Sequence, residues 1–186
     1  MAAADTVEAR AARGDRAAFS ALMAETRSDL HRFIRRYVGE DGEAHDVLQE
    51  TYVAAWLAIG RYDPTRPFAT WLRTIAVNKC RDWARKRTVR RLIRGVAGLE
   101  SREVQDLPEP APSAEHSLDD RRRLAAVNRA IDALPDHLKA PLLLSVLEGR
   151  SQSEIGAILN VSAKTVETRI ARARRKLAAA VGDRVD

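Results

Sequence analysis

Hydrophobic side chains recur every three or four positions along most of the chain, the spacing that gives an α-helix one apolar face. Residues 17–38 form the first such stretch, and the sequence Gly-Glu-Asp-Gly at 39–42 ends it. A second stretch covers about 44–59, where Val53 and Leu57 are among the residues expected to pack. Strand-like alternation is rare. The pattern therefore predicts an all-α protein.

A short loop at 61–68 cannot be regular helix, because its two prolines fix the backbone and restrict the residues before them. The loop holds two aromatic and two arginine side chains, and a helix is predicted over 69–87. From Arg73 to Arg94 there are nine basic residues and one acidic residue. Aromatic rings beside cations suit single-stranded nucleic acid, because bases stack on the rings while the cations hold phosphates. For Trp71, burial in the core is the favoured interpretation.

Composition changes at residues 95–120, which contain seven acidic residues, one basic residue and three closely spaced prolines. Few large apolar residues occur there, so the segment is predicted to be a flexible acidic linker. It would divide the chain into two small helical domains, at 1–94 and 121–186.

The second domain is predicted to begin with two helices, over 121–134 and about 137–147, separated by Pro135. Both carry apolar residues at helical spacing, and Pro141 is expected to kink the second helix. The residues that follow, 148–150, turn the chain into a further pair of helices.

This last pair has the signature of a helix-turn-helix. Ser151 and Glu154 match the capping box that begins a helix, and Asn160 tolerates the left-handed conformation that ends one. Ser162 can cap the second helix. The apolar stripe of that second helix consists of Val166, Ile170, Ala173 and Leu177. Two helices joined by so short a turn predict a DNA-binding module at the C-terminal end.

The outer face of the second helix is polar and basic. Residues 164–176 hold six basic residues and one acidic residue, whereas a merely solvated helix more often mixes charges of both signs. The face opposite the apolar stripe consists of Lys164, Thr168, Arg172 and Arg175. The pattern favours reading of duplex DNA in the major groove.

Charge and composition narrow the function further. The net charge of +6 favours an anionic partner. A single cysteine, Cys80, excludes an internal disulfide and a cysteine-built metal site, and a lone cysteine on a helix is more often a small buried residue than a redox sensor. The four histidines lack metal-ligand spacing, so no metal or other cofactor is expected. No signal peptide and no apolar run long enough for membrane insertion occurs, so a cytoplasmic protein is expected.

Two long segments carry a family resemblance. The segment LPDHLKAPLLLSVLEGRSQSEIGAILNVSAKTVETRIARARRKL resembles the C-terminal domain of bacterial sigma-70-family factors of the extracytoplasmic-function (ECF) group. The segment DVLQETYVAAWLAIGRYDPTRPFATWLRTIAVNKCRDWARK resembles the N-terminal domain of that group. The resemblance implies an alternative sigma factor, which joins core RNA polymerase and directs transcription initiation from specific, stress-responsive promoters.

The resemblance also assigns residues to contacts. It implies that the second helix of the N-terminal domain docks on a coiled coil of the polymerase β′ subunit, and that the β flap is a further contact. The matching docking positions are Asp46, Leu48, Gln49 and Glu50. Residues that would capture a flipped base of the −10 element, or hold the backbone beside it, are Tyr62, Arg66, Phe68, Asn78, Arg81, Arg85 and Lys86.

For the −35 element, the resemblance implies reading by the second helix of the helix-turn-helix. The residues at its start and on its base-facing positions are Lys164, Thr165, Glu167, Thr168, Ala171, Arg172 and Arg175. Arg172 could bind a guanine bidentately and Glu167 could accept from a cytosine amine. Gly156, Asn160 and Ala163 depart from the small residues common in relatives, which affects the expected −35 sequence but not the role.

Two other functions compete with this one. An ordinary helix-turn-helix regulator would bind duplex DNA alone, usually as a dimer at a palindrome, and would not need the aromatic loop and the basic helix after it. An enzyme is disfavoured because no nucleophile–histidine arrangement, metal spacing or glycine-rich phosphate loop occurs. Family members are often held inactive by an anti-sigma factor, and the sequence leaves open whether this chain has one.

Overall fold

The computed structural model describes residues 6–96 and 118–182, and within these residues every regular element is helical. The elements in chain order are α1 (Val7–Ala12), α2 (Arg16–Val38), α3 (Asp41–Ala58), the 3₁₀ turn η2 (Ile59–Arg61), α4 (Phe68–Val96), α5 (Leu118–Asp132), α6 (Asp136–Glu148), α7 (Gln152–Leu159), and α8 (Ala163–Gly182). The all-α prediction is confirmed.

Helix lengths differ from the sequence prediction in three places. Helix α1 was not predicted, α4 continues nine residues beyond the predicted end at Arg87, and α5 begins at Leu118. The predicted linker at 95–120 therefore overlaps both helices, and its remaining residues lie outside the described part of the chain. Pro141 lies inside α6, which continues without interruption from Asp136 to Glu148.

Local signals in the sequence account for where the helices begin and end. The Asp15 side chain accepts hydrogen bonds from the backbone N–H groups of the first turn of α2, and Gly39 ends that helix at φ 90°. The predicted capping box begins α7 (Gln152–Leu159): Ser151 and Glu154 each accept from the other's backbone N–H. Asn160 then ends α7 in the left-handed conformation, at φ 54° and ψ 50°.

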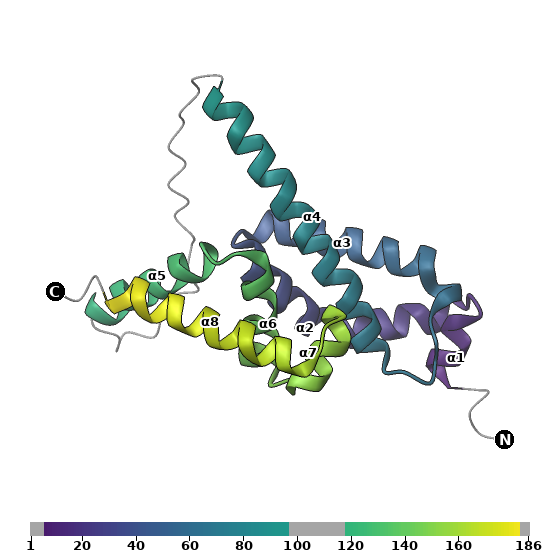
Figure 1. Cartoon of the computed structure of the whole chain (residues 1–186). Helices are drawn as coiled ribbons and strands as arrows, with labels where there is room; N and C mark the ends of the chain where they lie inside the picture. The colour runs from purple at the N-terminus through teal and green to yellow at the C-terminus, as the bar shows by residue number, and fades with distance from the viewer. Residues whose placement is uncertain (1–5, 97–117, 183–186) are drawn as a thin grey trace.

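The predicted division into two domains is visible in the packing, but the domains also touch one another. Helix α2 packs against α3 and α4 in the first domain, and α8 packs against α5, α6 and α7 in the second. Contacts between the domains join α2 to α6 and α4 to α7. Figure 1 shows the C-terminal part of α4 extending away from this body.

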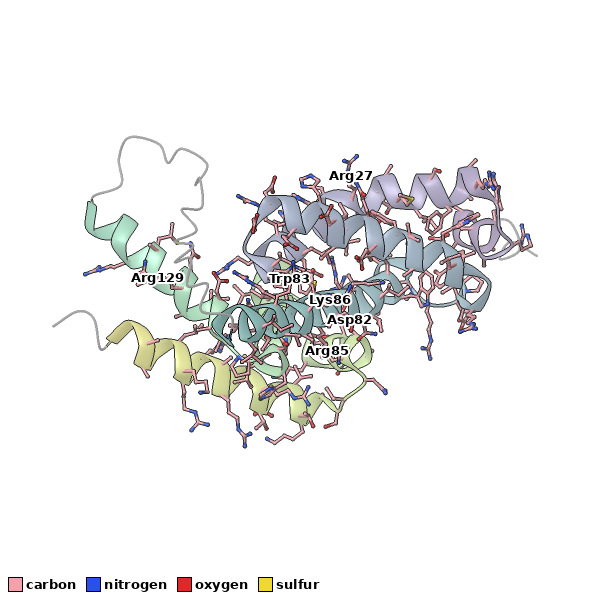
Figure 2. All side chains as sticks on the ribbon, turned by 90° about the horizontal axis from the view of Figure 1, so that it is seen from above. Arg27, Asp82, Trp83, Arg85, Lys86 and Arg129 are labelled. Carbon is pink, nitrogen blue, oxygen red and sulfur yellow. The ribbon has the colours of Figure 1, made fainter. Side chains whose placement is uncertain are left out.

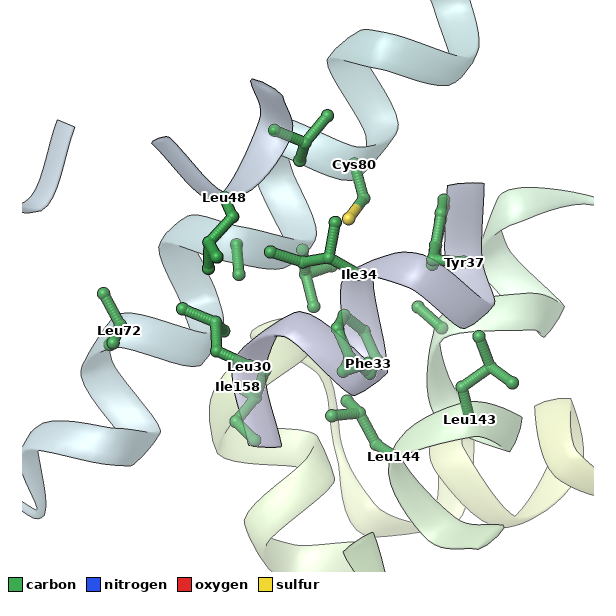
Figure 3. Close-up of a cluster of buried hydrophobic side chains, with 14 of the residues drawn as sticks. Leu30, Phe33, Ile34, Tyr37, Leu48, Leu72, Cys80, Leu143, Leu144 and Ile158 are labelled. Carbon is green, nitrogen blue, oxygen red and sulfur yellow. The ribbon is translucent and has the colours of Figure 1, made fainter. Parts of the chain in front are cut away.

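A continuous hydrophobic core crosses the boundary between the domains (Figure 3). Phe33 of α2 is fully buried, and so are Leu144 of α6 and Ile158 of α7. Cys80 of α4 is also fully buried in this cluster, and burial raises the pKa of its thiol. The interpretation of Cys80 as a small buried residue is confirmed.

Polar groups add to the contact between the domains. Arg73 of α4 and Glu148 of α6 have side chains only 5% and 10% exposed, and Arg73 Nη2 lies 2.8 Å from a carboxylate oxygen of Glu148. Lys139 of α6 donates a hydrogen bond of 2.8 Å to the Tyr37 carbonyl oxygen of α2. The Tyr37 hydroxyl in turn donates to Asp136 Oδ1 at 2.9 Å. The domains are therefore joined by both apolar and charged contacts.

Candidate nucleic-acid interface

The outer face of α8 is fully available to a partner. The residues predicted to read duplex DNA are exposed, except Thr165, which is half-buried: Lys164, Thr165, Glu167, Thr168, Ala171, Arg172 and Arg175. On the inner face, Val166 and Ala173 are fully buried and Ile170 is 7% exposed. The predicted apolar stripe is confirmed, and it fixes which side of α8 faces outward.

Hydrogen bonds organise the first turn of α8. Ser162 Oγ accepts from the Thr165 backbone N–H at 3.1 Å, as predicted for the cap of this helix. Lys164 Nζ lies 2.9 Å from Glu167 Oε2, and the Thr168 hydroxyl donates to the Lys164 carbonyl oxygen. Since Lys164 and Glu167 neutralise one another, the free positive charge on this face comes chiefly from the arginines that follow.

The turn between α7 and α8 depends on a close approach at Gly156. A Cβ atom placed on Gly156 would lie 2.6 Å from the Val161 carbonyl oxygen, closer than real Cβ contacts come. The backbone N–H of Val161 donates to the Gly156 carbonyl oxygen at 3.0 Å. The absence of a side chain at Gly156 therefore allows the turn that sets α8 against α7.

A second basic surface lies along α4. Asn78, Arg85 and Lys86 are exposed, and Arg81 is half-buried with Nη1 3.5 Å from Asn78 Oδ1. Figure 2 shows Arg85 and Lys86 on this helix together with Asp82, which forms an ion pair with Arg85. The structure brings these four predicted DNA-contacting residues onto one helix.

Trp83, on the same helix, is half-buried and held from two sides. Its indole N–H donates to Glu43 Oε2 of α3 at 2.6 Å, and the Arg87 guanidinium lies over the ring at 5.1 Å. Trp83 therefore links α4 to α3 in this structure.

The aromatic residues of the loop at 61–68 are packed inward. Tyr62 and Phe68 are each only 4% exposed, and their ring centroids lie 5.4 Å apart at nearly right angles. Trp71 packs against Tyr62 with the ring centroids 5.0 Å apart, so its predicted place in the core is supported. The Tyr62 hydroxyl donates to the Arg66 carbonyl oxygen at 2.6 Å, and burial raises the pKa of Tyr62 to about 12. Of the predicted loop contacts, only the Arg66 side chain is open to solvent, at 80% exposed.

The predicted docking positions on α3 separate into two groups. Asp46, Gln49 and Glu50 are exposed, whereas Leu48 is 5% exposed and contributes to the core. Lys79 of α4 lies 3.4 Å from Glu50 Oε2. The structure thus leaves three of the four predicted positions open to a partner.

Sequence analysis missed the apolar part of this α3 surface. Val53 and Leu57 were expected to pack, yet they are 60% and 80% exposed. They line an open groove of about 460 Å³ together with Asp46, Gln49, Glu50, Ala54 and Lys79. The helical positions 46, 49, 50, 53 and 57 repeat at steps of three and four, which is the signal that could have placed them on one face. Acidic and exposed apolar side chains therefore share one continuous surface.

Comparison with known proteins identifies the family. The family profile Sigma-70 region 2 matches residues 22–95, and the profile Sigma-70, region 4 matches residues 124–177. These two regions in this order define a sigma-70-type transcription factor.

Named relatives identify the group within that class. The chain is 37% identical to RNA polymerase sigma factor CnrH of Cupriavidus metallidurans, over 92% of this chain and 90% of the relative. It is 33% identical to ECF RNA polymerase sigma factor SigW of Bacillus subtilis, over 89% of each chain. The chain therefore belongs to the extracytoplasmic-function group of the sigma-70 family and is an alternative sigma factor.

Solved structures show the same fold. The structure of CnrH in complex with the cytosolic domain of CnrY matches with a TM-score of 0.68 and 31% identity, covering 96% of each chain. The sigma factor RpoE of Bartonella quintana, solved with the anti-sigma factor NepR, matches with a TM-score of 0.67. It covers 90% of this chain and 98% of that one at 23% identity, and so supports the fold alone. Among the helices that the structure describes, none is long and apolar enough to cross a membrane.

Proposed function

We propose that this chain binds core RNA polymerase and directs transcription initiation at promoters whose −10 and −35 elements it recognises. The N-terminal domain, 1–94, would dock on the polymerase and open the −10 element. The C-terminal domain, 121–186, would read the −35 element, and residues 95–120 would connect the two. The observation that carries the proposal is that an exposed groove with apolar and acidic side chains and two basic helical surfaces occur in one chain.

The groove on α3 supports docking on the polymerase. Exposed leucine and valine side chains beside acidic ones suit a partner helix with apolar and basic residues, because both kinds of contact are then complementary. In this proposal Leu57 and Val53 supply apolar contacts, while Asp46 and Glu50 set orientation. Leu48 acts indirectly, by holding α3 against the core. The β′ coiled coil is the proposed occupant, and the β flap is a second proposed contact.

The basic surface of α4 supports contact with the −10 element. Arg81, Arg85 and Lys86 provide charges for phosphates, and Asn78 can donate and accept hydrogen bonds with a base. Because Tyr62 and Phe68 are buried, we propose that they shape the loop that presents Arg66, and do not stack on bases in the arrangement seen here. Base capture by these rings would require the loop to move.

The exposed face of α8 supports reading of the −35 element. Arg172 is exposed and has the planar donor pair that binds guanine bidentately. Glu167 could accept from a cytosine only if its contact with Lys164 is released. Thr168, Ala171 and the other exposed residues of this face would contact bases or phosphates around Arg172.

Run-off transcription with purified core polymerase on a pool of the host's promoter fragments tests the proposal. Addition of the protein should produce new transcripts, and alignment of the upstream sequences should reveal two shared elements. If the protein instead shifts discrete duplexes without core polymerase and gives no new transcripts, it is an ordinary helix-turn-helix regulator.

Two substitutions then separate the surfaces. Leu57→Asp should abolish binding to core polymerase, whereas Val7→Asp, at an exposed valine of α1, should leave it intact.

Arg172→Ala should weaken discrimination at one −35 base pair by about 1–3 kcal/mol. Arg129→Ala removes an equal charge from an exposed position on α5 (Figure 2) and should leave the sequence preference unchanged.

An anti-sigma factor is a further proposed partner. The similar structure of CnrH was solved in complex with a second protein, the cytosolic domain of CnrY. The exposed apolar residues of the α3 groove would suit such an inhibitor, because covering them would exclude polymerase. Copurification of a chain that protects Leu57→Cys from thiol labelling would support this partner, and labelling unchanged by every copurified chain would argue against it.

A further inference from the structure

Tertiary structure brings together two histidines that lie far apart in the sequence. His31 is on α2 and His45 is on α3, and their ring centroids are 4.5 Å apart. Asp41, at the first position of α3, lies between them: one carboxylate oxygen is 3.7 Å from His31 Nε2 and the other is 3.7 Å from His45 Nδ1. Each residue offers a ligand atom, and these atoms all lie within 4.8 Å of one another.

We propose that His31, Asp41 and His45 form a binding site for a divalent transition-metal ion of the zinc type. Two imidazoles and one carboxylate are a ligand set that zinc and its neighbours in the first transition row accept, with solvent completing the coordination. The site lies at the corner where α2 turns into α3, and none of its three residues lines the α3 groove described above.

His31 has a ring nitrogen that is free to bind a metal ion. Its Nε2 atom is shielded from solvent and makes no hydrogen bond in the structure.

Only small movements would complete the coordination. Tetrahedral zinc, with bonds of about 2.0–2.1 Å, holds its ligand atoms roughly 3.3 Å apart, somewhat closer than the present separations. The side chains of Asp41 and His45 are 59% and 47% exposed, so both can rotate toward His31 without disturbing the core. Metal binding would replace two present contacts with bonds to the ion. In the first, Arg35 Nε lies 3.1 Å from Asp41 Oδ1, and in the second, His45 Nδ1 lies 2.9 Å from the Asp41 carbonyl oxygen.

The binding test uses the full-length, untagged chain and isothermal titration with Zn²⁺. One ion should bind per chain and raise the thermal midpoint, because an ion that binds only the folded state stabilises it. His45→Ala and His31→Gln should each weaken binding by more than the roughly 10–100-fold that loss of an outer-shell partner costs. His137→Ala, at an exposed histidine of α6, is the matched control and should bind as the wild type does.

Co²⁺ supplies a second readout that does not depend on stability. A bound Co²⁺ ion with nitrogen and oxygen ligands gives visible absorption, which should appear with the wild type and with His137→Ala and be absent from His45→Ala. The proposal is wrong if Zn²⁺ does not bind, or if binding is equally strong in His45→Ala and in the wild type. Because His45 is half-exposed, its substitution should not unfold the chain, and circular dichroism would verify this.

Discussion

At the scale of single residues, Gly156 offers the sharpest steric test. In Gly156→Ala the new Cβ would meet the Val161 carbonyl oxygen at 2.6 Å, and this atom belongs to the backbone of the turn, which yields less easily than a flexible side chain. The variant should lose about 1–3 kcal/mol of stability, the usual cost of overpacking, as measured by denaturant unfolding.

The control for this variant is Gly42→Ala. Gly42 lies within α3, and a Cβ there meets nothing within 4 Å. This change should be neutral or should stabilise by up to about 1 kcal/mol, since alanine is the better helix former. Equal losses in both variants would contradict the steric account of the turn.

Cys80 gives a prediction about reactivity. Its side chain is fully buried, and burial raises the pKa of the thiol, so the reactive thiolate is scarce at neutral pH and remains scarce as the pH rises toward 9. The folded chain should therefore resist a water-soluble thiol reagent across this range, while the chain in denaturant reacts at once. Rapid labelling of the folded protein would show that the core around Cys80 opens readily.

At the scale of elements, the capping box of α7 can be tested by substitution and by pH. Ser151→Ala should cost about 1 kcal/mol at pH 7. The control Ser153→Ala, at an exposed position in the same helix, should change stability little. Chemical denaturation of both variants beside the wild type makes the comparison.

The pH dependence follows from Glu154. Hydrogen bonds from the Ser151 side chain and then its backbone lower the pKa of Glu154 below its ordinary 4.5. The folded state therefore takes up this proton less readily than the unfolded state, and the stabilisation is complete above pH 4.5 and lost as the pH falls through the folded-state pKa. The gap between wild type and Ser151→Ala should narrow below pH 4.5, and a constant gap would contradict it.

Helical periodicity predicted most elements but could not decide what covers each apolar face. The predicted positions of α2, α7 and α8 agree well with the structure, because helix caps and apolar stripes are local features of the sequence. Helical periodicity misjudged Leu57, since an apolar residue at helical spacing looks the same whether its own fold or a partner covers it. The structure buries the rings of Tyr62 and Phe68, which the sequence did not indicate, and their contact with bases stays a prediction.

Contacts between segments that are distant in the sequence could not be predicted from helical periodicity. The pairing of His31 with His45 depends on how α2 packs against α3, and spacing along one helix gives no sign of it. The contact of Arg73 with Glu148 joins two domains across a segment that was predicted to separate them. Sequence analysis treated Arg73 as one of a run of cations, whereas the structure buries it.

At the scale of the whole molecule, the ion pair of Arg73 with Glu148 is one of the contacts that join the domains. Burial lowers the pKa of Arg73, Glu148 opposes that shift, and two guanidinium nitrogens of Arg73 have no hydrogen-bond partner. Removal of Glu148 would leave a buried cation without its counter-ion, a change that typically costs about 3–5 kcal/mol. The cation regains water if the domains separate.

Glu148→Ala should therefore shift the chain toward separated domains. Small-angle X-ray scattering should show a larger radius of gyration than for the wild type, with unchanged helix content. The control Glu25→Ala removes an exposed acid that lines the cleft between the domains, and it should leave the scattering curve unchanged. A compact Glu148→Ala protein would show that the apolar contacts alone hold the domains together.

The core shared between the two domains also sets a limit on affinity. A partner that binds only separated domains meets a chain in which the competent form is a minor population, and its apparent dissociation constant rises in inverse proportion to that population. If about one chain in a hundred is open, every such partner binds about a hundredfold more weakly than its own contacts would allow. Substitutions at Phe33 or Leu144, far from any proposed contact surface, would then tune the occupancy of all these partners together.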